Sequence, residues 1–331
     1  MHPCEIRILL ATTLLAALIT ACGSAKPRSD VSHDGEIKKK APSIGTVVKT
    51  EQPVDPDDYE VTGSGPAEPD EEEAVEQKPI PPAPKVGLIL GPGAIKAFAH
   101  IGVLQEFARK RVQIHSIAGL EFGALIAGFY AVKGQPFEPE WQLFKIKEDD
   151  LIGKQLLTSA IKSKNPEDLR GFFASTLPKI DIDETRVPFT CPIWDLNKNQ
   201  TLMMTRGSLD ESLMTCMSFA PLYQPFQDKW IGAAFDLKST SDQLRSQGAN
   251  LIIYVNVIGQ NENLNLQDYE KWLWSLTQGQ LQKQMKGVDY VVNVDTSGIG
   301  LADFGARKVL VQKGVQAAKN VADQMIQKFG L

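Results

Sequence analysis

The residues that could do chemistry lie in the segment SIAGLEFGAL, residues 116–125. An apolar run ends at Gly119, a second glycine follows at Gly123, and helix-forming residues come next. A strand, a sharp turn and a helix form the frame on which many hydrolases mount a nucleophilic serine. The middle of this turn is Glu121, so the segment indicates either an enzyme that uses a carboxylate or an enzyme fold that no longer cuts.

The elements that must position this turn alternate between strand and helix. Short aliphatic runs predict buried strands, and apolar residues spaced three and four apart predict helices. The expected strands are 85–91, 112–119, 250–257 and 289–295, and the expected helices are 94–111, 121–132, 267–285 and 305–329. Strands separated by helices predict an α/β fold with a mainly parallel sheet and helices on both faces.

Several segments, in order through residues 85–331, resemble the patatin-like phospholipase family. They are LILGPGAIKAFAHIGVL, the elbow GLEFG, SFAPLYQPF, LRSQGANLIIYVNV and NVDTSGIGLADF. The resemblance implies a patatin-like three-layer α/β fold. It also implies a Ser–Asp dyad that hydrolyses acyl esters of lipids, with the oxyanion stabilised by backbone N–H groups of the glycine-rich loop.

Both catalytic positions of that family are degenerate here. The nucleophile position is Glu121, and the aspartate of the family's Asp-Gly-Gly motif falls at Gly232. Asp228 and Asp236 flank that position, but either would need a local shift to serve. We therefore assign no catalytic residue and expect a pseudoenzyme with a lipid-binding or envelope-scaffold role. The alternative is an active acyl-ester hydrolase that uses Glu121 or a relocated dyad.

The glycine-rich loop is a remnant of an oxyanion loop. It keeps Gly91, Gly93 and the basic residue Lys96. However, Pro92 supplies no N–H, and Ala94 disfavours the positive φ that a glycine would allow.

Two interpretations of Glu121 remain open. As a nucleophile on an ester it would be weak, because a carboxylate has an ordinary pKa of about 4.3 and its product would be an anhydride. As a structural residue, Glu121 would lie near a helix N-terminus, which favours negative charge. We expect it to form an ion pair with Lys96 that plugs the former active site.

Other candidate residues have simpler structural interpretations. His100 and His115 are expected to pack in a helix and a strand. Trp272 and Trp274 could meet a lipid surface, but core packing of their helix is the preferred interpretation. No residues have metal-ligand spacing, and no cofactor is expected.

The N-terminus predicts a secretory signal. Arg7 precedes an apolar run over residues 8–19, which is shorter than the about 20 residues that span a bilayer. The run ends in LITACG, which resembles a bacterial lipobox with Cys22 as the acylated residue. We expect a signal peptide over 1–21 and a chain anchored by palmitate-type acyl groups on Cys22. The residue after the cysteine is glycine rather than aspartate, which favours the outer membrane of the bacterial envelope.

Residues 22–84 are expected to form a disordered tether before the patatin-like domain at 85–331. Residues 23–84 hold 10 prolines, 14 acidic and 7 basic residues and one aromatic residue, too little apolar surface to fold. The domain has 27 basic and 25 acidic residues, so nothing favours nucleic acid as a partner. The expected partners are the membrane, a bound lipid or fatty acyl chain, and an unidentified envelope protein.

Four cysteines are present, of which Cys4 leaves with the signal peptide. Cys191 and Cys216 could pair in an exported domain. Two buried free thiols are the preferred expectation, and the sequence leaves the disulfide open.

Overall fold

The computed structural model describes residues 83–152, 163–259, 266 and 268–330. These residues belong to one compact unit, Ala74–Leu331. The predicted signal peptide, Cys22 and the tether as far as residue 82 lie outside the described residues and stay predictions.

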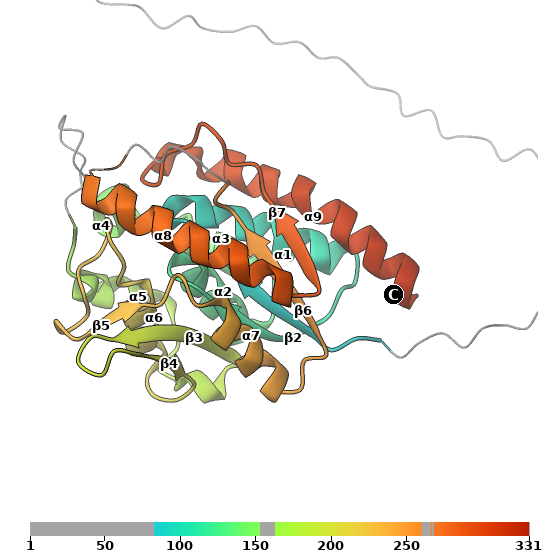
Figure 1. Ribbon diagram of the computed structural model, residues 1–331, viewed down its shortest axis with the longest axis horizontal. Coiled ribbons are helices and arrows are strands. Elements are labelled where there is room, and N and C mark those ends of the chain that lie inside the picture. Colours follow the sequence, from blue (N-terminus) through green and yellow to red (C-terminus); the bar gives the residue numbers. More distant parts are fainter. Residues whose placement is uncertain (1–82, 153–162, 260–265, 267, 331) are drawn as a thin grey trace, which may run out of the picture. The chain divides into compact units, whose positions relative to one another are not determined.

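The described part of the chain contains one seven-stranded sheet in the order β4-β3-β2-β1-β6-β7, with β5 paired to β3 (Figure 1). The strands are β1 Val86–Leu90, β2 Ile114–Gly119, β3 Phe189–Asp195, β4 Gln200–Met204, β5 Trp230–Gly232, β6 Leu251–Asn256 and β7 Tyr290–Asn293. The pairs β3–β2, β2–β1, β1–β6 and β6–β7 are parallel. Strands β4 and β5 are antiparallel to β3. The expected mainly parallel α/β sheet is therefore confirmed.

The α-helices of the described residues connect and cover the strands. They are α1 Ala99–Arg109, α2 Phe122–Lys133, α3 Glu138–Leu143, α4 Glu148–Leu151, α5 Arg170–Thr176, α6 Leu209–Met217, α7 Leu237–Ser246, α8 Asp268–Gln284 and α9 Arg307–Phe329. Short 3-10 helices are η1 Ala94–Phe98, η2 Pro166–Leu169, η3 Ile182–Glu184, η4 Met285–Gly287 and η5 Phe304–Ala306. The helix expected over 94–111 thus begins as a 3-10 turn.

Helices cover both faces of the sheet because alternate residues of a strand point to opposite sides. Leu88 and Leu90 of β1 join the large core cluster with residues of α1, α2, α6 and α9. Ile89 joins a second cluster with Leu244 of α7 and Leu281 of α8. The three-layer arrangement is visible in Figure 1, where α7 and α8 lie on the near side of the sheet.

Glycines end two of the long helices in the left-handed conformation. Gly134 follows α2 at φ 64° and Gly330 follows α9 at φ 67°. A residue without a β-carbon adopts this conformation at little cost, so both positions stop a helix cleanly.

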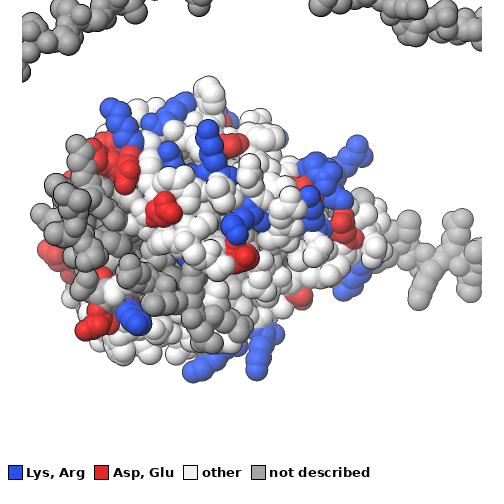
Figure 2. All heavy atoms as spheres, turned by 90° about the horizontal axis from the view of Figure 1, so that it is seen from above, with Lys and Arg blue, Asp and Glu red and all other residues white. Residues whose placement is uncertain are grey.

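The surface carries mixed charge. On the face seen in Figure 2, basic and acidic side chains are interspersed. Within the described residues, no helix combines the length and apolar character needed to cross a membrane.

Candidate functional site

The site forms where two adjacent parallel strands end. Leu90 at the end of β1 lies in register with Gly119 at the end of β2, so the loops that follow meet at one edge of the sheet. The Leu120 N–H donates to the Leu90 carbonyl at 2.9 Å and holds the two loops together. This register places the 91–94 loop beside Glu121.

Glu121 occupies the turn between β2 and α2 and is 1% exposed. Its carboxylate Oε2 accepts hydrogen bonds from the backbone N–H of Gly93 at 3.0 Å and of Ala94 at 2.8 Å. Two converging backbone donors at this range are what an oxyanion hole offers to a reacting oxygen. The Glu121 carboxylate therefore occupies both of these backbone donors.

Burial dominates the electrostatics of this carboxyl group. Removal from water raises the pKa of Glu121 to about 7, although hydrogen bonds from the backbone N–H groups of Gly93, Phe122 and Ala94 act in the opposite direction. Near neutral pH the group therefore exchanges between its charged and protonated forms. The charged form is the better acceptor for the backbone donors.

Lys96 lies close to this loop but contacts a different part of the chain. Its side chain is buried, and Nζ donates to the Thr296 carbonyl at 3.3 Å. The Thr296 hydroxyl in turn donates to the Val257 carbonyl at 2.6 Å, after β6. No ion pair joins Glu121 to Lys96 in the described part of the chain, because backbone amides hold the carboxylate. The expected Glu121–Lys96 pair is thus corrected to a carboxylate–amide contact.

The elbow glycines are required by close packing. A β-carbon at Gly119 would lie 2.2 Å from the Ala124 Cα, and one at Gly123 would lie 2.2 Å from the Leu90 carbonyl oxygen. Any side chain at these positions would push α2 away from the strand ends. The two glycines therefore hold Glu121 against the 91–94 loop.

The loop keeps its shape despite its unfavourable residues. Ala94 adopts φ 49°, in the left-handed region that the sequence was expected to avoid. The bond from its N–H to Glu121 offsets part of the strain. At Gly91, a β-carbon would lie 2.6 Å from the Tyr254 hydroxyl, so this glycine is also required.

Gly232 lies in β5, where there is no room for an acidic side chain. Its N–H donates to the Ser218 carbonyl at 2.8 Å. A β-carbon at this position would lie 2.0 Å from the Cys216 carbonyl oxygen. The position at which the sequence placed the family's aspartate is therefore closed by the backbone.

The other acids and bases singled out in the sequence have structural partners. Asp236 accepts from the Ser239 N–H at 2.9 Å and caps α7. His100 Nε2 donates to the Gly91 carbonyl at 2.8 Å, and burial lowers its pKa to about 4. His100 is thus neutral and packed, and it fixes the start of the glycine-rich loop. His115 bonds the Gln247 carbonyl at 3.1 Å.

Two buried aromatic side chains stack beside the elbow, a feature that was not predicted from the sequence. The Tyr223 ring stacks on Phe122 with 6.0 Å between centroids, and its hydroxyl donates to the Leu151 carbonyl. Burial, and secondarily the charge of Glu121, raise the pKa of Tyr223, so it stays protonated. Tyr223 belongs to the quoted segment SFAPLYQPF, but spacing alone gave no sign that it packs beside the elbow.

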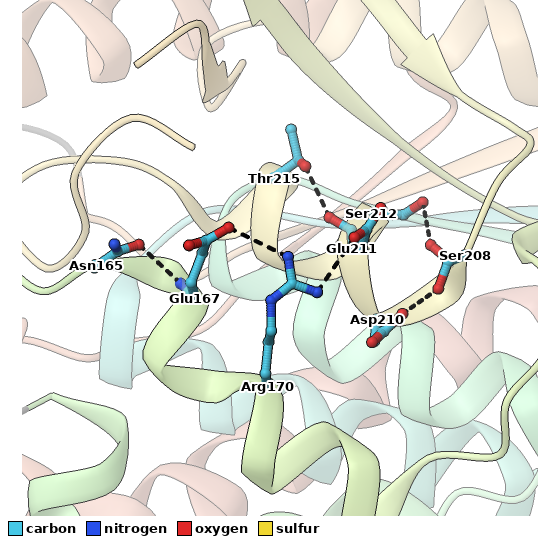
Figure 3. Close-up of polar contacts among 8 residues, drawn as sticks. All are labelled: Asn165, Glu167, Arg170, Ser208, Asp210, Glu211, Ser212 and Thr215. Atoms are coloured by element: carbon cyan, nitrogen blue, oxygen red, sulfur yellow. Dashed lines mark hydrogen bonds and ion pairs between the residues drawn. The ribbon is translucent and has the colours of Figure 1, made fainter. Parts of the chain in front are cut away.

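A polar network and a disulfide hold α6. Arg170 bonds both Glu167 and Glu211 at 3.2 Å, linking η2 and α5 to α6 (Figure 3). At the other end of the helix, Cys216 forms a disulfide with Cys191 of β3, with Cα atoms 6.1 Å apart. The preferred expectation of two free thiols is therefore wrong. The covalent link fixes the backbone that closes the Gly232 position.

The geometry defines a class: an α/β protein with a strand–turn–helix elbow whose Glu121 carboxylate accepts hydrogen bonds from the 91–94 loop. Comparison with known proteins agrees with this class. The Patatin-like phospholipase family profile matches residues 88–229, a span that ends before Gly232. Residues 88–229 of this chain therefore carry a patatin-like phospholipase domain.

Individual relatives are distant. A putative patatin-like phospholipase domain-containing protein of Caenorhabditis elegans is 24% identical over 56% of this chain and 18% of its own length. An uncharacterized NTE family protein of Mycobacterium tuberculosis is 24% identical over 44% of this chain and 40% of its own. A lysophospholipase of Neurospora crassa is 25% identical over 54% of this chain and 12% of its own. The chain thus spans less than half the length of these relatives.

Solved structures were also compared. VipD from Legionella pneumophila aligns over 74% of this chain and 67% of its own, with a TM-score of 0.49 and 9% identity. ExoU of Pseudomonas aeruginosa, in complex with SpcU, aligns over 76% of this chain and 54% of its own, with a TM-score of 0.39 and 13% identity.

Proposed function

We propose that this chain is a lipid-anchored patatin-like pseudoenzyme of the bacterial envelope, with Glu121 acting as a built-in plug of its former active site. The observation that carries the proposal is the pair of hydrogen bonds from Gly93 and Ala94 to the Glu121 carboxylate. An ester carbonyl cannot use these donors while the carboxylate occupies them. The plug belongs to the chain itself and needs no added inhibitor.

Two further features support loss of the family's chemistry. The elbow carries no hydroxyl, so the acyl-enzyme of a Ser–Asp dyad cannot form there. The aspartate position is a glycine with no space for a side chain. Restoring a serine at the elbow alone would therefore leave the dyad without its aspartate.

The Cys191–Cys216 disulfide supports a location outside the cytoplasm. Structural disulfides persist in oxidising compartments and are rare in the cytosol of mesophiles. Export agrees with the predicted signal peptide and with acylation of Cys22. On this proposal the protein binds a lipid or acyl chain, or scaffolds an envelope partner, while held at the membrane.

An esterase assay on the mature chain tests the loss of catalysis. Acyl esters of several chain lengths are offered to the native protein, to Glu121→Ser and to Glu121→Gln. We expect turnover at the buffer rate for all three, because no proton acceptor stands at the Gly232 position. Native turnover that disappears in Glu121→Gln would contradict the proposal.

Metabolic labelling with a palmitate analogue tests the anchor separately. We expect label on the native protein and none on Cys22→Ser, with the native protein in the membrane fraction. Equal label on both proteins would exclude Cys22 as the acylated residue.

An active hydrolase that uses Glu121 remains the second candidate, because one observation favours it. The pKa of Glu121, raised to about 7, lies where a general base works best at neutral pH. This candidate predicts ester turnover that rises with pH through the region of 7 and is lost in Glu121→Gln. The same assay, run as a pH series, separates the two candidates.

A further inference from the structure

Helix α8 has two contrasting faces. Trp274, Thr277 and Leu281 are buried against the domain. On the opposite side, Tyr269 is 67% exposed, Trp272 58% and Leu276 47%. The spacing of these three residues places them on one side of a helix. We call Tyr269, Trp272 and Leu276 the α8 stripe.

The orientation of the α8 stripe is fixed by its neighbour in the sequence. Trp274 donates its indole N–H to the Ala220 carbonyl at 2.9 Å and packs edge-on against Phe219. With Trp274 held in the core, Trp272 faces outward, and the rings of Tyr269 and Trp272 lie 6.4 Å apart. The expected core packing thus holds for Trp274 and is wrong for Trp272. Figure 1 shows α8 along the outside of the domain.

We infer that the α8 stripe docks on the lipid surface of the membrane to which the chain is tethered. This inference rests on the proposed acylation of Cys22. Tyr and Trp side chains favour the bilayer interface, where an apolar ring and a polar atom are both accommodated. Exposed Lys283 lies seven residues after Leu276 on the same side of the helix and adds attraction to anionic headgroups.

The chain outside the structure makes such weak docking effective. Residues 23–84, which the sequence predicts to be disordered, separate Cys22 from the domain, and a random coil of this length would span roughly 40–50 Å. An anchored domain therefore meets the membrane at an effective concentration on the order of millimolar. At this concentration a contact of a few side chains is enough to keep the domain on the membrane, although the same contact would bind a free protein only weakly.

A second copy of the chain fits the α8 stripe less well. Stable protein interfaces take about 20–30 residues from each side. Three exposed apolar side chains on one helix provide far less. A lipid surface requires no complementary protein surface, so a narrow row of apolar side chains can bind it.

Quenching by brominated lipids tests the docking on the full mature chain. Cys22 is coupled through its thiol to a maleimide lipid in phosphatidylethanolamine–phosphatidylglycerol vesicles, while Cys191 and Cys216 remain in their disulfide. Tryptophan fluorescence is then read with brominated acyl chains. We expect quenching in the native protein, its loss in Trp272→Phe, and its retention in Trp141→Phe, which removes a 66% exposed tryptophan on α3.

A second measurement uses the uncoupled chain. We expect Tyr269→Ala with Trp272→Ala to weaken its partition into the same vesicles about tenfold, a change of about 1.4 kcal/mol. Quenching that persists in Trp272→Phe, that disappears in Trp141→Phe, or that is absent from the native protein would overturn the inference. So would a native dimer that the α8 substitutions convert to monomer. Because the coupling is chemical, these results do not depend on whether cells acylate Cys22.

Discussion

At Glu121 the backbone adopts φ 52° and ψ −125°, a conformation that residues with a β-carbon seldom take. Such strain costs about 1–3 kcal/mol and persists only where the surroundings impose it. Here the elbow glycines and the donors of the 91–94 loop impose it. The strained turn geometry that is typical of a nucleophile elbow is therefore present here with Glu121 at its centre.

The raised pKa of Glu121 predicts a pH-dependent stability. The native state holds this proton up to about pH 7, whereas the unfolded chain releases it near the ordinary value of 4.5. Between these values the native state binds more protons, so its free energy of unfolding falls as pH rises. Relative to Glu121→Gln, the native protein should lose up to about 3 kcal/mol across this window. Urea unfolding of both proteins from pH 4 to pH 8 measures the difference.

The control for this prediction is the pH region beyond the window. Above about pH 8 the difference between the two proteins should be constant, because Glu121 is then ionised in both states. A constant difference over the whole range would show that the Glu121 carboxyl titrates normally.

The close packing at Gly232 predicts that adding a single methyl group there lowers the stability of the domain substantially. In Gly232→Ala the β-carbon meets the Cys216 carbonyl, and overpacking of this kind costs about 1–3 kcal/mol. Gly279→Ala in α8 is the matched control, because a β-carbon there contacts nothing within 4 Å. That variant should gain roughly 0.5–1 kcal/mol from helix propensity. Thermal unfolding compares them, and equal melting temperatures would contradict the closed position.

The Glu121 site was predictable from the sequence only in part. The spacing of Gly119, Glu121 and Gly123 indicated the turn, and the resemblance placed the 91–94 loop beside it. The choice of backbone amides over Lys96 was not predictable, because it depends on side-chain reach and on burial. The lack of room at Gly232 was equally hidden, because it arises from the distant Cys216 backbone.

At the scale of elements, α1 and α9 make a close crossing that depends on two glycines. A β-carbon at Gly102 of α1 would lie 1.9 Å from the Val311 carbonyl oxygen, and one at Gly314 of α9 would lie 1.9 Å from that of Ala99. The backbone of each helix thus packs directly against the glycine of the other helix. The glycine in AHIGVL, quoted for the family resemblance, is explained by this packing.

Separation of these helices is the expected result of Gly314→Ala. The added methyl group forces α9 away from α1 and should destabilise the domain by about 1–3 kcal/mol despite the better helix propensity of alanine. Gly171→Ala in α5 serves as the control, because its β-carbon meets nothing within 4 Å. Denaturant titration gives both values. A Gly314→Ala variant as stable as the control would mean that the crossing is looser than described.

The elements with strong periodicity were predicted well. The expected strands at 85–91, 112–119, 250–257 and 289–295 contain β1, β2, β6 and β7. Strand β3 and the antiparallel strands β4 and β5 were not predicted. β5 is only three residues long and β4 is partly exposed, so neither leaves a clear apolar pattern.

At the scale of the whole molecule, the disulfide links the sheet to the layer that covers it. Cys191 and Cys216 are 25 residues apart in sequence and lie in β3 and α6. Their pairing could not be predicted, because it depends on how α6 folds back over the strand. In an unfolded chain the bond closes a loop that spans β4 and most of α6.

Reduction of this bond should lower stability by about 3–4 kcal/mol on the loop-entropy estimate. The measurement is thermal unfolding with and without a thiol reductant. The Cys191→Ser, Cys216→Ser double variant provides the reference. Its melting temperature should equal that of the reduced native protein and should not change when reductant is added. A native protein that is indifferent to reductant would mean that the bond is absent in solution.

The contact between α1 and α9 also constrains how the domain is made. α1 lies near the start of the described chain and α9 near its end, so their side of the sheet is fully covered only after these two distant helices meet. Contacts between such remote segments slow folding. The α1–α9 crossing is therefore expected to be among the last parts of the domain to form.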